Sequence, residues 1–149
     1  MFTIQSTRVD ETALKAGMMD LRAGAFVCFE GWVRNRNDGR DVLRLEYECY
    51  EALALKEGAR IVAEAAARFD VLGLRCVHRT GSLDIGELAV WVGVTAEHRG
   101  EAFEACQYVI DEIKHRVPIW KRETYSDGRS EWVECAHCAG HAAEDRRHA

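Results

Sequence analysis

A short basic segment holds the side chains best suited to chemistry. Residues 114–122 carry four formal positive charges, and the first acidic residue after them is Glu123. The whole chain is acidic, with a net charge of -5, so this local cluster is unusual. The dipole of a helix stabilises a cation in its last turn by about 0.3–1 kcal/mol, and Lys121 and Arg122 could be ordinary solvated strand residues. Charge alone therefore does not identify a site.

The spacing around Lys114 adds a geometric argument. If residues 100–116 form a helix that Pro118 stops, one buried stripe is expected to contain Phe103, Cys106, Ile110, Ile113 and Val117. Lys114 would lie at the edge of this stripe, partly removed from water. Burial and nearby cations lower the pKa of an amine, which makes it usable as a base, acid or nucleophile. Beyond the proline, an extended chain puts Lys121 and Glu123 on one face and could return Lys121 toward Lys114.

Two other places carry cations that packing does not explain. His98 and Arg99 directly precede or open the same helix, where a positive charge opposes the dipole. An anion bound there would reconcile them, although both could also be exposed loop residues. The end of an earlier strand places Trp32 and Arg34 on one face and Val33 on the other. A guanidinium beside an aromatic ring suits a flat or anionic ligand, but equally an ordinary exposed strand end.

The cysteines give a weak metal signal. Cys135, Cys138 and His141 have ligand-like spacing, but a structural zinc site needs four ligands and no second, well-separated pair is present. The sequence therefore predicts no metal. The N-terminus lacks the features of a signal peptide and no apolar run is long enough to span a membrane, so we expect a cytoplasmic protein with reduced thiols and no nucleic-acid or membrane partner.

The elements that must position these residues follow from periodicity and turn signals. The 149 residues fit one domain at 1–138 with a flexible tail at 139–149. Hairpin strands with helices between them indicate an α+β fold. In the strand at 42–50, alternation predicts that Leu43, Leu45, Tyr47 and Cys49 are buried. The expected helices are 10–22, 52–69 and 100–116, and the other expected strands are 2–8, 24–34, 74–79, 87–95, 119–125 and 131–135, with turns at 37–39 and 126–129.

Four blocks of the chain resemble the molybdopterin synthase catalytic (large) subunit family. They read GAFVCFEGWVRNRNDGR from residue 24, VHRTGSLDIGELAVWVGVTAEHRGEAF from 77, DEIKHRVPIWKRE from 111 and SDGRSEWVEC from 126. The resemblance implies an α/β hammerhead-type core with an additional antiparallel β subdomain. It also implies a homodimer that carries a small ubiquitin-like sulfur-carrier subunit at each end, as a heterotetramer.

The implied activity is a sulfurtransferase reaction in molybdenum cofactor biosynthesis. The partner's C-terminal Gly-Gly thiocarboxylate would deliver sulfur to cyclic pyranopterin monophosphate, forming the dithiolene of molybdopterin without a resident cofactor. By this resemblance the catalytic residues are Lys114 and Lys121, and the substrate-binding residues are Trp32, Val33, Arg34, His98, Arg99, Arg122 and Glu123. Some family members have a basic residue at the position that Trp32 occupies in this chain.

Two alternatives stay open from the residues alone. The basic segment could dock an anion or a peptide tail without chemistry. A partly buried lysine among cations also suits a Schiff-base enzyme, which borohydride trapping of a carbonyl substrate on Lys114 would reveal.

Overall fold

The structure is a computed structural model that describes residues 1–133. Residues 134–149 lie outside the described part; they include the cysteine and histidine cluster and the tail expected at 139–149. In chain order the elements are β1 (Phe2–Gln5), α1 (Glu11–Ala16), β2 (Ala25–Trp32), β3 (Arg36–Asn37), β4 (Arg40–Cys49), α2 (Glu51–Arg68), β5 (Gly73–Arg79), β6 (Gly81–Asp84), β7 (Leu88–Ala96), α3 (Arg99–Arg116), β8 (Ile119–Tyr125) and β9 (Ser130–Val133).

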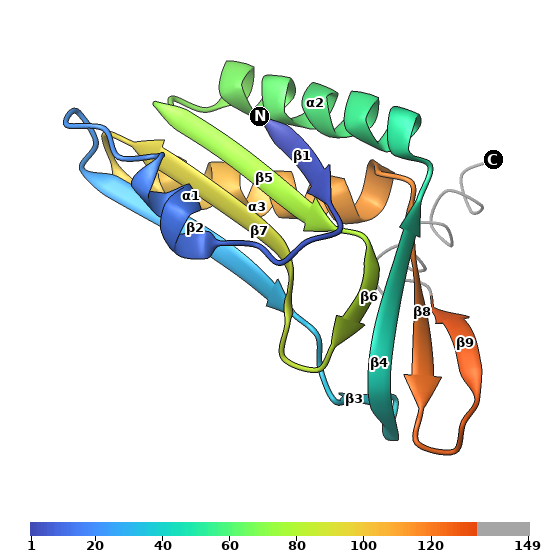
Figure 1. Cartoon of the computed structure of the whole chain (residues 1–149). Coiled ribbons are helices and arrows are strands. Elements are labelled where there is room, and N and C mark those ends of the chain that lie inside the picture. Colours follow the sequence, from blue (N-terminus) through green and yellow to red (C-terminus); the bar gives the residue numbers. More distant parts are fainter. Residues whose placement is uncertain (134–149) are drawn as a thin grey trace.

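The first subdomain is a four-stranded sheet with helices on both faces. Its strand order is β1-β5-β7-β2, in which β1 runs parallel to β5 and the other pairs are antiparallel. The long helices α2 and α3 lie along one face, and the short α1 lies against the other (Figure 1). Because both faces are covered, β7 is apolar along nearly its whole length rather than alternating. In the described part, no helix is long and apolar enough to cross a membrane.

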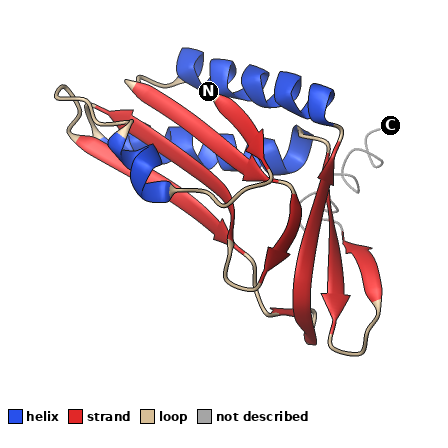
Figure 2. Ribbon diagram, viewed as in Figure 1, coloured by secondary structure: helices blue, strands red, loops and turns tan. Residues whose placement is uncertain are grey.

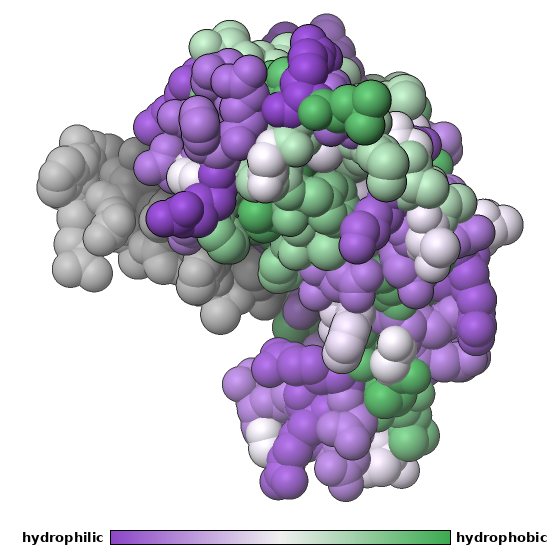
Figure 3. Space-filling view, turned by 90° about the vertical axis from the view of Figure 1, so that its left-hand side faces the viewer, coloured by the Kyte–Doolittle hydropathy of each residue, from purple (hydrophilic) through white to green (hydrophobic). Residues whose placement is uncertain are grey.

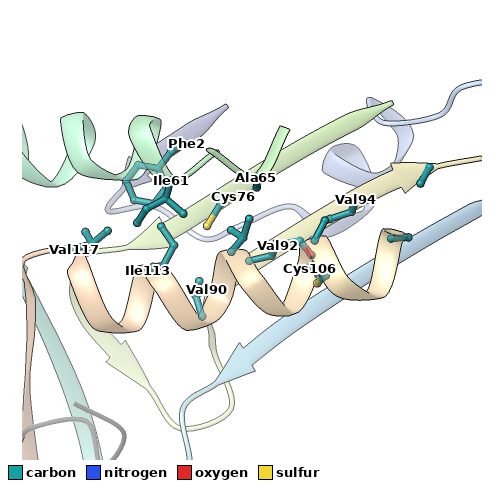
Figure 4. Close-up of a cluster of buried hydrophobic side chains, with 14 of the residues drawn as sticks. Phe2, Ile61, Ala65, Cys76, Val90, Val92, Val94, Cys106, Ile113 and Val117 are labelled. Atoms are coloured by element: carbon teal, nitrogen blue, oxygen red, sulfur yellow. Dashed lines mark hydrogen bonds between the residues drawn. The ribbon is translucent and has the colours of Figure 1, made fainter. Parts of the chain in front are cut away.

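The main core lies between the sheet and the two long helices. In Figure 4, Ile61 and Ala65 of α2 and Cys106 and Ile113 of α3 belong to the same buried cluster as Val92 of β7. The stripe expected on α3 is only partly correct. The helix buries Ala102, Ala105, Cys106, Val109 and Ile113, whereas Phe103 is 60% exposed. The actual stripe is displaced around the helix because small alanines, rather than the phenylalanine, allow α3 to approach the sheet closely.

The second subdomain is an antiparallel sheet beside the first (Figure 2). Its order is β3-β4-β8-β9, and β6 also pairs with β4. The expected turn at 37–39 joins β3 to β4, with positive φ at Asp38 (49°) and Gly39 (76°), as a tight hairpin turn requires. The register shifts between Val42 and Arg44, which turns Leu43 outward. The prediction that Leu43 is buried was therefore wrong: it is 57% exposed, and Val42 is buried in its place.

The α+β class with a separate antiparallel subdomain is confirmed. The first helix is shorter than expected: Asp10 does cap it, its Oδ1 accepting from the backbone N–H of Ala13 at 3.0 Å, but it ends at Ala16. Strand β6 was not expected. It takes the connection between β5 and β7 out of the first sheet and into the second, so the subdomains are linked by pairing as well as by packing.

Candidate active site

A basic cavity of about 190 Å³ lies where the two subdomains meet. It collects residues from β2, β4, β7, α3 and β8, so no single element builds it. Its walls include the buried, apolar Val33, Val42 and Leu45. Six of the nine residues that the sequence singled out line it: Trp32, Val33, Arg34, Lys114, Lys121 and Glu123.

Lys114 and Lys121 face this cavity because the chain bends sharply between them. Helix α3 ends at Arg116, and Val117 is extended (φ -77°, ψ 128°) as the residue before a proline prefers. Strand β8 begins two residues later, at Ile119. Lys114 thus lies in the last turn of α3, in the first subdomain, and Lys121 lies in the first half of β8, in the second subdomain. Both side chains are half-buried.

The charge of the cavity suits an anion. Four cationic side chains line it, those of Arg34, Arg36, Lys114 and Lys121, against the single carboxylate of Glu123. Glu123 is only 4% exposed, and the Asn37 side-chain amide donates to its two carboxylate oxygens at 3.1 and 3.0 Å. This carboxylate is therefore held in place, and an incoming anion would meet a net positive wall.

A second, smaller cavity of about 50 Å³ shares both lysines with the first. It adds His78 of β5, which sequence reasoning missed. His78 is 3% exposed, its Nδ1 donates to the backbone carbonyl of Arg79 at 2.7 Å, and its ring meets that of Tyr47 edge-on with centroids 5.0 Å apart. Burial lowers the pKa of His78 to about 4, and the charge of Lys114 contributes in the same direction. The available signal was a histidine inside a strand expected to be buried.

Three predicted substrate-binding residues lie elsewhere. His98 and Arg99 are exposed at the start of α3, and the rise of about 1.5 Å per residue places them about 22–24 Å from Lys114 near the other end of the helix. Arg122 points to the opposite face of β8, where it pairs with Glu46 and lies 5.4 Å from the centroid of the Trp132 ring. One chain alone does not bring these residues to the basic cavity.

Arg116 shows that part of the basic segment is structural. Its guanidinium forms ion pairs with Glu57 and Glu64 of α2, at 2.7 and 2.6 Å, and with Glu112 of its own helix at 3.2 Å. These contacts raise the pKa of Arg116 and lower that of Glu64. One of the four charges in residues 114–122 thus ties α2 to α3.

Other hollows have a different character. A cavity of about 460 Å³ near the β6–β7 turn is lined by four carboxylates and two arginines. A shallow groove of about 420 Å³ on the outer face of the second sheet is lined by Trp120, Trp132, Val133, Glu48 and Lys121. Lys121 therefore lies between this aromatic groove and the basic cavity. Within residues 1–133, no group of three or more histidine, cysteine or acidic side chains could hold a metal ion.

Fold and site together define an α+β protein with a basic cavity, lined by lysine and arginine, between two sheets. The family described as "MoaE protein" matches residues 4–116. The molybdopterin synthase catalytic subunit of rice (Oryza sativa subsp. indica) is 46% identical over 129 residues, which cover 87% of this chain and 66%, just under two thirds, of the rice subunit. The chain belongs to the family of molybdopterin synthase catalytic subunits.

Solved structures agree. Molybdopterin synthase from Staphylococcus aureus superposes with a TM-score of 0.82 at 35% identity, covering 87% of this chain and 94% of that one. A complex of subunits 1 and 2 of the molybdopterin-converting factor from Helicobacter pylori superposes with a TM-score of 0.71 at 25% identity, covering 91% of this chain and 90% of the other.

Proposed function

We propose that this chain is the catalytic subunit of a molybdopterin synthase. It would transfer sulfur from the thiocarboxylated C-terminus of a small ubiquitin-like partner to cyclic pyranopterin monophosphate. The observation that carries the proposal is the basic cavity of a member of this family, in which Lys114 of α3, Lys121 of β8 and Arg34 of the loop after β2 meet.

The lining of the cavity suits the proposed substrate by its charge and by its apolar wall. Arg34 and Arg36 would bind the cyclic phosphate, since a guanidinium can donate two parallel hydrogen bonds to a phosphate. The buried Val33 would form an apolar wall for the pterin rings, and Trp32, which is 65% exposed, would cover the cavity mouth. Glu123 would accept from an N–H group of the pterin or from one of the lysines.

The aromatic groove would supply a route for the partner's tail. Trp120 and Trp132 are both about half-exposed, and the groove they line reaches Lys121. A Gly-Gly tail has no side chains, so it could lie across these rings and place its thiocarboxylate at the inner cavity. The similar Helicobacter pylori structure is a complex of subunits 1 and 2 of its molybdopterin-converting factor, which supports a small-subunit partner here.

The two lysines would share the chemistry. The thiocarboxylate sulfur would bond to a substrate carbon as a carbon–oxygen bond at that carbon breaks, and the displaced oxygen would stay on the phosphate or leave as water. A second water would then cleave the resulting thioester, which leaves the sulfur on the substrate and releases the partner as an ordinary carboxylate. Lys121 would stabilise the negative charge of the tetrahedral intermediate, because fixed cations in a site shielded from water are effective there. Lys114 would donate or accept the proton. Two such deliveries complete the dithiolene.

A second copy of the chain would account for His98 and Arg99. They lie about 22–24 Å from Lys114 along α3, so a two-fold axis that pairs α3 antiparallel with its copy would bring them to the other copy's cavity. The molecule exposes apolar surface near this helix start: Phe103 is 60% exposed and Phe29 of the edge strand β2 is 37% exposed. Viewed from the end where β2 and α3 begin, hydrophobic residues gather in the middle of a hydrophilic face (Figure 3). These features support the homodimer that we propose.

Reconstitution tests the function. The purified chain is mixed with a thiocarboxylated Gly-Gly partner and cyclic pyranopterin monophosphate, and molybdopterin is assayed. Lys114→Ala should reduce product formation by at least 100-fold, whereas Lys56→Ala, on the exposed side of α2, should leave it unchanged. No product from the unaltered chain with a verified partner would refute the proposal. An adduct on Lys114 after borohydride treatment would favour Schiff-base chemistry instead.

The cysteines of the described part are free thiols, in keeping with the cytoplasmic location that we also propose.

A further inference from the structure

A neutral histidine is buried against the two lysines of the proposed active site. His78 lies on β5, which belongs to the first sheet, yet its ring lines the small cavity with Lys114 of α3 and Lys121 of β8. A buried histidine that serves packing alone usually has apolar neighbours. Here two cationic side chains, those of Lys114 and Lys121, line the same cavity, so the protonation and hydrogen bonding of the imidazole affect the two ammonium groups.

The tautomer of this ring follows from its hydrogen bond. A backbone carbonyl can only accept, so the contact of 2.7 Å to the Arg79 oxygen requires that Nδ1 carries the proton. In the neutral ring Nε2 then has a free lone pair and can only accept. The Tyr47 ring, edge-on at 5.0 Å, restricts rotation of the imidazole. Both ring nitrogens therefore have assigned roles.

The charged and titratable groups around the ring keep it neutral. Lys114 faces it from α3, Lys121 from β8 and Tyr47 from β4, all in the lining of one cavity. Its partners in the sheet, Ile4 on β1 and Val90 on β7, are apolar. Burial, aided by the lysine charge, lowers the pKa of His78 to about 4. The ring thus adds an acceptor to a cationic site without adding a third positive charge.

We propose that His78 is a positioning residue for sulfur transfer, whose Nε2 accepts a hydrogen bond within the cavity from the Lys114 ammonium group or from a water bound to it. The proposal deepens the proposed function, because it concerns the same site. An acceptor favours the protonated amine. Without it, Lys114 should lose its proton at lower pH, whether the lysine serves as acid or as base.

Trace acetylation tests the proposed effect of His78 on the protonation of Lys114, and it needs neither substrate nor partner. The folded protein is treated with acetic anhydride from pH 6 to 11, and the Lys114 and Lys56 peptides are quantified by mass spectrometry. His78→Phe keeps a ring but has no acceptor, so the pH of half-maximal Lys114 reactivity should fall by about 0.5–1 unit, the equivalent of one hydrogen bond. His78→Gln places an amide oxygen close to the Nε2 position and should restore the midpoint.

Val77→Ala is the matched control. Val77 is buried on the same strand but packs with Trp91 and Met18 on the opposite face, so its loss should lower stability and leave the Lys114 midpoint unchanged. If His78→Phe does not fold, His78→Asn, which retains a donor near Nδ1 and no acceptor at Nε2, should show the same shift. An unchanged midpoint in a folded Phe or Asn variant would overturn the proposal. Because labelling needs no product, this result is independent of whether the chain makes molybdopterin.

Discussion

Acidification should destabilise the protein through His78 before its carboxylates are protonated. Burial holds the pKa of His78 at about 4 in the folded protein, against 6.5 for an ordinary histidine. The unfolded chain therefore binds a proton between these values that the folded chain rejects. When the unfolded state binds more protons, stability rises with pH, so the stability from the neutral ring is complete above pH 6.5 and decreases as pH falls toward 4.

The size of the effect follows from the two pKa values. Between pH 7.5 and pH 5, linkage of a single group with these values predicts a loss of about 2 kcal/mol in the free energy of unfolding. Urea unfolding at several pH values measures it, and His78→Gln is the reference because it cannot titrate. The other histidines and the carboxylates contribute equally to both proteins, so the difference between the two pH profiles isolates His78. Parallel profiles over this range would show that His78 binds a proton in the folded protein as readily as in the unfolded chain, and would refute the reasoning.

Three further predictions concern the scaffold. Gly58→Ala should destabilise the protein by about 1–2 kcal/mol in thermal unfolding, because an added Cβ would lie 2.1 Å from the Phe2 ring and overpacking exceeds the gain in helix propensity. Arg116→Met should lower the free energy of unfolding by about 1–2 kcal/mol, and high salt should reduce the difference, since it removes the cation that three carboxylates share, and of these Glu57 keeps its ion pair with Arg60. In native protein, iodoacetamide should label the exposed Cys28 and spare Cys76, whose pKa burial raises to about 12, as peptide mapping would show.

Much of the fold could be predicted because its signals are local. The amphipathic pattern of α2, the Asp10 cap and the turn at Asp38 and Gly39 depend on residues close together in the chain. Strand β6 could not be found in this way. It has four residues, only Leu83 among them is a large hydrophobic, and its reason to be extended is a pairing with β4 more than thirty residues away.

The site residues also differ in whether local sequence signals predict their position. The bend at Pro118 and the alternation in β8 are local, and they predict that Lys114 and Lys121 approach each other. Six predicted residues do line one cavity, but His98 and Arg99 show the limit of reasoning from charge. The helix dipole indicated an anion at the start of α3, but the length of the predicted helix already separates that end from Lys114, so within one chain the same anion cannot contact both ends. His78 reaches them because two sheets meet, a fact that no sequence window contains.

Because β6 pairs with the second sheet between two strands of the first, cutting the chain cannot separate the two subdomains that carry Lys114 and Lys121. Within residues 1–133 the backbone passes between the two sheets five times: after β2, β4, β5, β6 and α3. Neither subdomain is a continuous segment, so no truncation isolates one of them and no single split point yields two independent folding units. Amide hydrogens of both sheets should consequently exchange with solvent in one cooperative opening. The relative placement of the lysine on α3 and the lysine on β8 is thereby a property of the whole fold, set before any substrate arrives.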